Sequence, residues 1–460
     1  MLFSSITFLY YFLPVVLILY LIIPSKFKNL VLLIFSLLFY FYGEPKYILI
    51  LLLSCFINYI SGILIENYRN KSKLILIFSI LYNVIQLLYF KYTDFFVTNI
   101  NNIFNINIGL FRIIMPIGIS FFTFQTLSYV IDVYRKDVKA SKNFFDFATY
   151  VSLFPQLIAG PIVRYKDIEK ELKERKVTYE NFGNGVRRFI IGLSKKVLIA
   201  NVLGELCTSL TGMSNVTILG SWINSISFTL QIYFDFSGYS DMAIGLGLMF
   251  GFHFLENFNY PFISKSITDF WRRWHISLSS FFKDYVYIPL GGNRVNKLKW
   301  FRNIFVVWFL TGFWHGAAWN FIIWGLYFAV LLILEKNVWG KYLDKTKIFK
   351  YIYTIFLIVI SFTIFNANSF NEVVNNLKNM FFLNNISFIN IETIYHIRNY
   401  IVVLVIAIIA STPLLKILIQ KIKHKKIIDI LDIIYCFILL IVVTAFLVDS
   451  SFNPFLYFRF

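Results

Sequence analysis

The chain has 460 residues, of which 58% are hydrophobic and only 15% are charged, whereas an ordinary soluble domain is about half apolar and about a quarter charged. So much apolar surface excludes a soluble globule and indicates a protein whose solvent is largely lipid. The net charge of +19 does not indicate a nucleic-acid-binding protein, because the basic residues cluster in short loops between apolar segments, as the positive-inside rule expects.

Apolar segments follow one another along the whole chain, and a membrane-spanning helix needs roughly 20 such residues. The first segment is interpreted as a retained helix, because it lacks the basic start and the cleavage site of a signal peptide. The three cysteines lack the spacing of a disulfide or zinc framework, so no metal is expected. The pattern predicts one all-α, polytopic domain over residues 1–460. The candidate spans are residues 6–23, 30–42, 47–65, 74–90, 188–208, 221–234, 242–254, 304–319, 321–335, 351–365, 401–417 and 428–448.

Basic loops orient these spans in the membrane, because loops rich in Lys and Arg stay in the cytosol. The connections 92–110 and 366–395 are rich in Asn and poor in Lys, which favours the outer face. Both termini are then expected outside a bacterial inner membrane. The loops assigned to the cytosol are residues 26–28, 69–73, 135–142, 164–176, 272–302, 336–350 and 416–426.

Two segments in the middle of the chain do not fit simple spans. Residues 144–162 are apolar but lie between two basic loops, and residues 257–290 carry prolines, glycines and many polar groups. Non-helical backbone at membrane depth is tolerated only where protein or a water-filled cavity satisfies it. We therefore predict re-entrant segments around an interior cavity, and we expect the chemistry to lie there.

His315 is the first candidate catalytic residue. It lies near the tip of a predicted hairpin of the spans 304–319 and 321–335, pointing away from the cytosol, and Gly312 and Gly316 allow close approach of a helix or a substrate. An ionisable group at membrane depth indicates function by default, and burial would keep the imidazole neutral and able to act as a base. The alternative is a packing histidine that is hydrogen-bonded to a backbone carbonyl.

His275 is the second candidate. If this segment is one helix, Trp271, His275 and Leu278 share a face by their spacing of three and four residues. Arg272 and Arg273 could then meet the phosphates of a donor, or serve with the tryptophan as anchors of an interfacial helix. The spacing leaves open whether His275 is catalytic or structural.

Three further polar residues are weaker candidates. Asp235 and Asp241 belong to a polar stretch that is expected to interrupt two apolar spans, where they either line the cavity or cap helix starts. Gln156 lies in a segment broken by prolines and a glycine. It could offer a substrate a hydrogen bond or serve the structure.

The order of these motifs resembles that of the membrane-bound O-acyltransferases, especially the bacterial branch that O-acetylates alginate or D-alanylates teichoic acid. The resemblance is strong over residues 115–324 and general in the flanking helices. The motifs that carry it are residues 115–122, 156–161, 235–241, 257–261, 271–279, 287–292 and 311–320.

The resemblance implies a ring of about 11 or 12 membrane helices with re-entrant segments around a central tunnel. The family's invariant histidine corresponds to His315, and its second, more variable polar position corresponds to His275. The donor enters from the cytosol, and an exported esterase-like or acyltransferase partner at the outer face completes transfer to a polysaccharide. The aromatic chain end also resembles this branch, so Tyr457 is either a transient acyl acceptor or an interfacial anchor.

The expected mechanism is general-base catalysis by His315 on an acceptor hydroxyl, whose oxygen attacks the thioester carbonyl of the donor. Trp314 and Trp319 would exclude water, and Asn320 could stabilise the oxyanion. No bound cofactor is expected; acetyl-CoA or another acyl thioester is the donor substrate, and acetyl transfer to a polysaccharide is favoured. The alternatives are D-alanyl transfer to teichoic acid, a transporter or flippase without enzymatic activity, and a scaffold for an outer-face enzyme.

Overall fold

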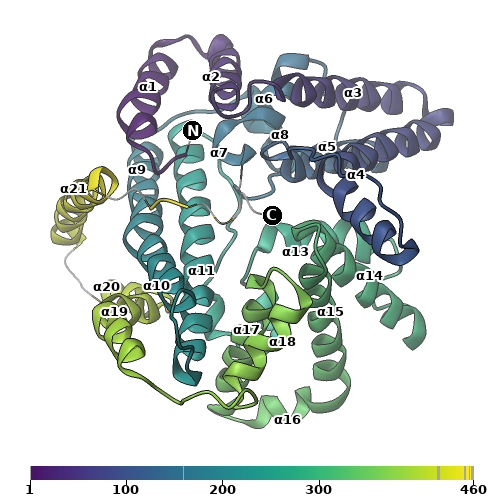
Figure 1. The fold of residues 1–460 in the computed structure, drawn as a ribbon. Coiled ribbons are helices and arrows are strands. Elements are labelled where there is room, and N and C mark those ends of the chain that lie inside the picture. Colours follow the sequence, from purple (N-terminus) through teal and green to yellow (C-terminus); the bar gives the residue numbers. More distant parts are fainter. Residues whose placement is uncertain (1, 159, 422–424, 450–451, 455, 457–460) are drawn as a thin grey trace. The chain divides into compact units, whose positions relative to one another are not determined.

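The structure is a computed structural model that describes residues 2–158, 160–421, 425–449, 452–454 and 456, and this part of the chain contains helices and no strands (Figure 1). Within it, seven helical segments are long and apolar enough to span a membrane, and a shorter apolar segment, Phe8–Ile22, precedes them. These findings confirm an all-α, polytopic membrane protein; the ring around a tunnel stays a prediction. The seven segments are Ser25–Gly43, Ile48–Asn67, Arg69–Phe104, Trp319–Lys345, Phe349–Asn366, Ile391–Ala410 and Asp429–Asp449.

The chain divides into two compact units. Unit 1 comprises Met1–Phe189 and Tyr239–Leu255, and unit 2 comprises Ile190–Gly238 and Glu256–Phe460. Unit 1 contains α1 (Leu13–Ile22), α2 (Lys28–Gly43), α3 (Ile48–Asn67), α4 (Ser72–Phe104), α5 (Ile119–Arg135), α6 (Phe144–Ser152), α7 (Phe154–Leu157) and α8 (Tyr165–Lys173). Two helices belong to both units, α9 (Tyr179–Ser194) and α11 (Ile218–Met249).

In the described part of the chain, eleven α-helices lie wholly within unit 2. They are α10 (Val202–Thr211), α12 (Ile267–Trp271), α13 (Ile276–Phe282), α14 (Lys297–His315), α15 (Trp319–Leu334), α16 (Gly340–Lys345), α17 (Phe349–Asn366), α18 (Phe370–Met380), α19 (Ile391–Ala410), α20 (Leu414–Gln420) and α21 (Lys425–Asp449). Short 3-10 or π-helical segments include η4 (Lys195–Asn201), η5 (Pro261–Ile263), η6 (Lys283–Tyr287) and η7 (Glu335–Trp339).

In unit 1, α3, α4 and α5 pack side by side around a buried polar network (Figure 1). Asn83 on α4 donates a hydrogen bond of 2.8 Å to Asn58 on α3, and its own Oδ1 accepts a hydrogen bond of 2.9 Å from Thr126 on α5. Because lipid does not drive helices together as water does, such bonds and close packing hold membrane helices to one another.

The predicted breaks in the middle of the chain are present in the structure. Gly118 has φ of +76°, and an added Cβ there would lie 2.5 Å from the carbonyl oxygen of Leu157, so the chain turns where only glycine fits easily. Residues 144–162 form the short helices α6 and α7, and residues 257–290 form η5, α12, α13 and η6 instead of one span.

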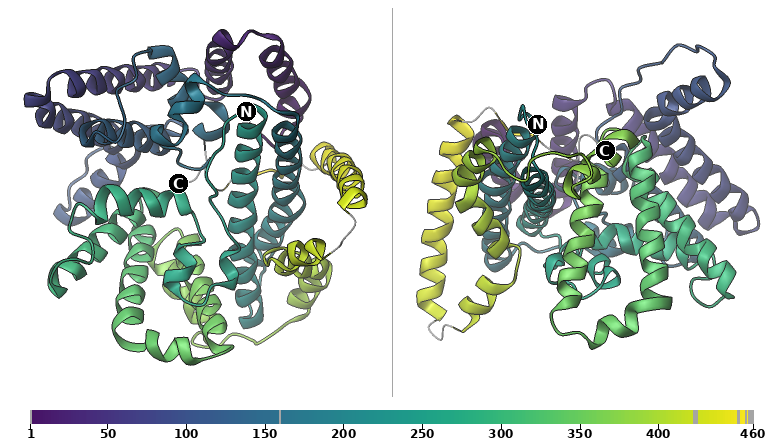
Figure 2. Two further views of the ribbon diagram at one scale, coloured as in Figure 1. Left: turned by 180° about the vertical axis from the view of Figure 1, so that it is seen from behind. Right: turned by 60° about the horizontal axis from the view of Figure 1, so that its bottom comes forward.

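In unit 2, α14 and α15 form the predicted hairpin, and α17 packs against α15 (Figure 2, green). Gly312 and Gly325 bring the two hairpin helices together. A Cβ added to Gly312 would lie 2.3 Å from the backbone oxygen of Phe321, and one added to Gly325 would lie 2.2 Å from that of Trp308. The backbones therefore touch at this level, which fixes the tip of the hairpin relative to both helices.

Two expectations about helix boundaries are wrong. The stretch around Asp235 and Asp241 does not interrupt two spans, because α11 is continuous from Ile218 to Met249. Both carboxylates lie inside that helix, so neither caps a helix start. Helix α4 also continues to Phe104, through part of the stretch that was expected to be an outer connection. Its Thr98 and Asn99 side chains point back along the helix and donate to carbonyl oxygens one turn earlier.

Candidate active site

His315 is the last residue of α14, and its side chain is 4% exposed. The helix ends there because Gly316 is fully extended, and α15 begins again at Trp319. A Cβ added to Gly316 would lie 2.2 Å from the ring of Phe321, so the connection fits tightly over the start of α15. The structure therefore places the imidazole at the buried tip of the hairpin, where the sequence predicts it.

Aromatic rings surround His315. Its ring lies 4.9 Å, centroid to centroid, from the ring of Trp324 on α15, at 88°, and 5.4 Å from that of Phe365 on α17. Trp314, which is also buried, lies 5.0 Å away. The side-chain amide of Asn320 donates a hydrogen bond of 3.1 Å to the carbonyl oxygen of Phe365, which holds the end of α17 to the start of α15. This aromatic cluster is suited to keeping water away from the imidazole.

His275 belongs to the same cluster. Its ring lies 6.1 Å from that of Trp314 and 4.6 Å from that of Phe236 on α11. His275 is fully buried, with φ of +44° in the turn between α12 and α13. The expectation that Trp271, His275 and Leu278 share one helical face is therefore wrong, because the left-handed residue breaks the helix.

The loop before α12 fixes the imidazole of His275. Its Nδ1 lies 3.2 Å from Oδ1 of Asn257, and that oxygen also accepts from the backbone N–H and the hydroxyl of Ser277 at 3.1 and 2.9 Å. Because an amide oxygen only accepts, Nδ1 carries the proton and Nε2 carries the lone pair. His275 lies outside the membrane-spanning helices, and burial lowers its pKa to about 3, which keeps it neutral.

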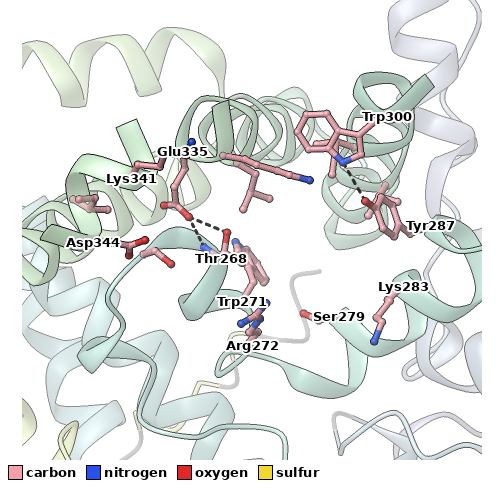
Figure 3. A pocket seen from close by; sticks show the side chains of 17 residues that line it. Thr268, Trp271, Arg272, Ser279, Lys283, Tyr287, Trp300, Glu335, Lys341 and Asp344 are labelled. Atoms are coloured by element: carbon pink, nitrogen blue, oxygen red, sulfur yellow. Dashed lines mark hydrogen bonds between the residues drawn. The ribbon is translucent and has the colours of Figure 1, made fainter. Parts of the chain in front are cut away.

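A cavity of about 680 Å³ lies beside this cluster in unit 2 (Figure 3). Arg272 and Lys283 line it together with Lys336 and Lys341, and Asp344 and the buried Glu335 are its acidic residues. The aromatic side chains of Trp271, Tyr287 and Trp300 also line it, and the indole of Trp300 donates to the hydroxyl of Tyr287 at 3.2 Å. The cavity therefore combines an apolar floor with an excess of positive charge.

Two tryptophans connect this cavity with His315. Trp271 lines the cavity, and its ring lies 5.7 Å from that of Trp324, which in turn lies 4.9 Å from the imidazole of His315. The indole N–H groups of Trp271 and Trp324 are buried and have no hydrogen-bond partner among the described residues. A buried donor without a partner costs about 1–3 kcal/mol, so these groups are suited to receiving a carbonyl oxygen.

Glu335 holds Trp271 in place. Its buried carboxylate accepts hydrogen bonds from the backbone N–H groups of Ile267 and Thr268 at 2.8 and 3.1 Å, and from the hydroxyl of Thr268 at 2.8 Å (Figure 3). These N–H groups open α12, whose first turn has no carbonyl partners within the helix. Glu335 thus caps the helix that ends at Trp271.

Replacing Glu335 by alanine is expected to lower the free energy of unfolding by about 1–3 kcal/mol, because it leaves the buried N–H group of Ile267 and the partly buried N–H group of Thr268 without acceptors. Thermal unfolding of the purified protein in detergent measures the change. Glu392→Ala, in the first turn of α19, is the matched control and should be nearly neutral. Equal melting temperatures for both variants would contradict the capping role.

The other predicted residues lie in different surroundings. Asp235 forms a buried ion pair with Lys196 in unit 2, at 2.6 Å. In unit 1, Asp241 accepts from Arg188 at 2.9 Å, and the buried amide of Gln156 donates to the carbonyl oxygen of Tyr150 at 2.5 Å. These bonds favour structural roles for Asp241 and Gln156.

Four predicted residues remain. Arg273 pairs with Asp269 at 2.9 Å, whereas Arg272 lines the cavity. Trp319 is 53% exposed, so it shields the site less than Trp314 does. Tyr457 lies outside the described residues.

Comparison with known proteins identifies the family. The model of the membrane-bound O-acyltransferase family matches residues 37–377, which is more than half of the chain. The chain belongs to the membrane-bound O-acyltransferase family. It is 43% identical over 381 residues to the probable alginate O-acetylase of Pseudomonas aeruginosa, covering 80% of this chain and 72% of that protein.

Two other relatives extend the range of acceptors. The acyltransferase is 38% identical over 426 residues to the peptidoglycan O-acetyltransferase of Helicobacter pylori, covering 84% of this chain and 81% of that protein. It is 31% identical over 282 residues to the teichoic acid D-alanyltransferase of Bacillus subtilis, covering 57% and 71%. The protein is thus a multi-pass membrane acyltransferase, and family membership favours acyl transfer over the transporter and scaffold alternatives.

Sequence reasoning missed three residues of the acyltransferase's candidate site. Trp324 lies in the apolar run of α15, and no feature of the sequence distinguishes it from aromatic residues that face lipid. Glu335 follows that run as one acidic residue among basic ones, and Asn257 precedes its contact at Ser277 by 20 residues. Only the observation that a carboxylate ends an apolar span, directly before a cytosolic basic loop, could have singled out Glu335.

Proposed function

We propose that this acyltransferase moves an acetyl group from a cytosolic thioester, acetyl-CoA, across the membrane for O-acetylation of an exported polysaccharide, with His315 as the general base. The proposal rests on the buried imidazole of His315 at the hairpin tip. Its ring contacts the ring of Trp324, which in turn contacts Trp271 in the floor of the basic cavity. A proton acceptor, a water-poor surrounding and a site for an anionic donor thus adjoin one another.

In the proposed reaction, neutral His315 removes the proton of the acceptor hydroxyl as its oxygen attacks the carbonyl carbon of the thioester. The carbon–sulfur bond then breaks, and the imidazolium returns its proton to the departing thiolate, so protons and charge balance. The indole N–H of Trp324 would donate to the carbonyl oxygen as negative charge develops on it. His275, held neutral by its surroundings, would orient the groups around Trp314.

The basic cavity supports a donor that carries phosphate groups. Arg272, Lys283, Lys336 and Lys341 line it, and Arg or Lys bonds to phosphate oxygens are stronger than bonds between neutral groups. The apolar floor at Trp271 suits the acyl arm, which would reach past the tryptophans toward His315. Because CoA is both phosphorylated and long-armed, its acetyl thioester fits this division.

The charge requirement is testable by reversing two lysines. Lys283→Glu combined with Lys341→Glu is expected to raise the KM for acetyl-CoA about tenfold with little change in kcat, since the two exposed cations together contribute about 1–2 kcal/mol to binding. Transfer of radiolabelled acetyl groups by the purified protein measures both constants. Lys345→Glu is the control, because Lys345 lies on α16 with Lys341 but does not line the cavity. An equal rise in KM in that variant would contradict the assignment.

The same assay separates the two candidate acyl groups. The longer and closer matches to O-acetyl transfer proteins favour acetyl, whereas the shorter match favours a D-alanyl group carried by a protein. We expect His315-dependent labelling from acetyl-CoA and none from a D-alanylated carrier protein. The reverse result would replace the donor and keep the general base.

Transfer to a glycan further requires steps at the outer face. We propose that both chain termini lie there and that an exported esterase-like protein receives the acyl group for the polysaccharide. Tyr457, at the aromatic chain end, stays a candidate transient acceptor. Acyl labelling of the chain that disappears in Tyr457→Phe would support the relay, and persistence of the label would favour the interfacial anchor.

A further inference from the structure

Unit 2 contains an ion pair that is almost fully removed from solvent. Lys196 in η4 is 2% exposed and Asp235 on α11 is 1% exposed, with 2.6 Å between Nζ and Oδ1. Burying two charges costs several kcal/mol for each ion, which their attraction offsets only when further hydrogen bonds satisfy both groups. The position of those further bonds therefore indicates what the pair is for.

Two further hydrogen bonds of the pair go to the C-terminal tail, which we define as residues 452–454 and 456. Nζ of Lys196 donates to the carbonyl oxygen of Pro454, and the backbone N–H of Leu456 donates to Oδ2 of Asp235 at 3.0 Å. The polarity is matched, because the cation meets a carbonyl oxygen and the anion meets an N–H group. Backbone groups of the tail thus complete the solvation of a buried ion pair.

A third polar residue adds a side-chain bond to the same arrangement. Asn201, at the end of η4, accepts from Nζ of Lys196 at 2.9 Å and donates to the side-chain oxygen of Asn453 at 3.2 Å. Gly204 leaves room for the tail, because an added Cβ would lie 3.0 Å from the ring of Phe452. Leu456, at 5% exposure, is buried at the end of this contact.

The residue that holds the tail on α11 is next in sequence to a residue that contacts the candidate active site. Phe236 directly follows Asp235 on α11, and its ring lies 4.6 Å from the imidazole of His275. His275 in turn belongs to the cluster of Trp314 and His315. A change in how Asp235 holds the tail is therefore made one residue from the wall of that cluster.

We propose that Lys196 and Asp235 form a latch that holds the C-terminal tail inside unit 2, and that they are positioning residues for acyl transfer. The inference rests on the proposed function for its effect on activity, whereas the holding of the tail stands on the contacts alone. A pair that served only to stabilise the helices would need no particular polarity toward the tail. A latch needs the cation opposite Pro454 and the anion opposite Leu456.

Two double variants separate these roles in the full-length protein. Lys196→Met with Asp235→Leu removes both charges and leaves no buried unpaired ion. Lys196→Asp with Asp235→Lys keeps an ion pair but presents a carboxylate to a carbonyl oxygen and an ammonium to an N–H group. A structural pair would tolerate the reversal, whereas a latch would not.

The reporter of the tail is a thiol. Leu456→Cys is introduced after Cys55, Cys207 and Cys436 are replaced by alanine, and labelling by a small soluble maleimide is timed in detergent. With the native pair we expect protection; in both double variants we expect labelling about tenfold or more faster, because reaction then needs no local opening. Protection that persists in both double variants, with normal folding, would overturn the latch.

Activity provides the second readout. Both double variants should lower the kcat of transfer while the KM for acetyl-CoA stays within about twofold, since the donor cavity is untouched. A chain that ends at residue 449 should show the same split, and it keeps the pair intact should a double variant fail to fold. Normal kcat in the shortened chain would overturn the positioning role. If the native protein transfers no acyl group from any thioester, the proposed function fails, and the thiol readout still decides whether the latch exists.

Discussion

Replacing His315 by alanine is expected to lower acyl transfer by about 10²–10⁴-fold, the contribution typical of a general base. The imidazole is buried at the hairpin tip, and removing it leaves the surrounding aromatic rings in place. His315→Gln, which keeps a hydrogen-bonding side chain of similar size, should lose as much activity because an amide does not accept a proton. Transfer of labelled acetyl groups from acetyl-CoA by equal amounts of folded protein measures the loss.

The chain offers a matched control for this experiment in a histidine of unit 1. His253 is exposed and pairs with Glu171 at 2.7 Å, so His253→Ala should retain nearly normal transfer. Folding of every variant is compared by size exclusion and thermal unfolding in detergent. A folded His315→Ala protein with near-normal transfer would remove His315 from the reaction and favour the packing alternative.

Gly325→Ala is expected to destabilise the protein severely, by about 3 kcal/mol or more, because overpacking a tight contact costs about 1–3 kcal/mol even where side chains can move. Here the added Cβ would lie 2.2 Å from a backbone oxygen of Trp308 and 3.1 Å from the Cα of Gly312. Backbone cannot rotate away as a side chain can, so α14 and α15 must separate. Yield of folded protein and its melting temperature measure the effect.

Gly183→Ala distinguishes this steric effect from the general cost of changing a helical glycine. Gly183 lies in α9, and an added Cβ there meets no atom within 4 Å. Alanine favours helix over glycine by about 1 kcal/mol, so this variant should be as stable as the native protein or more so. A Gly325→Ala protein that melts as high as Gly183→Ala would show that the hairpin helices do not need their close approach.

The sequence predicted the hairpin and the place of His315 because the relevant signals are local. Two apolar runs separated by a short turn of small residues specify the hairpin, and Gly312 and Gly316 indicate close packing. The breaks at residues 144–162 and 257–290 were also predictable, since prolines and glycines within apolar segments rarely continue a helix. For these features no knowledge of distant contacts is needed.

The prediction from helical spacing that Trp271, His275 and Leu278 share a face was wrong because one residue departs from the helical backbone. His275 adopts φ of +44°, which a non-glycine residue takes only when its surroundings enforce it. The enforcing contacts come from Asn257, 18 residues earlier, and cannot be read from the spacing around His275. The prediction that the polar stretch at Asp235 interrupts two spans was wrong for a different reason. A buried lysine and a backbone N–H group satisfy the Asp235 carboxylate, so the helix continues through it.

The π-helical segment η4 changes the direction in which side chains before and after it point. Helices α9, η4 and α10 follow one another without a break from Tyr179 to Thr211. A π-helical turn, such as those of η4, holds more residues than an α-helical turn. Each residue in an α-helix turns the facing direction by about 100°, so η4 lets the two flanking helices point their apolar sides in directions that one regular pitch would not allow. Loss of one residue between 195 and 201 would therefore rotate the residues on one side of it relative to those on the other. Apart from Lys196 and Asn201, this stretch should tolerate exchange of side chains far better than any change of length.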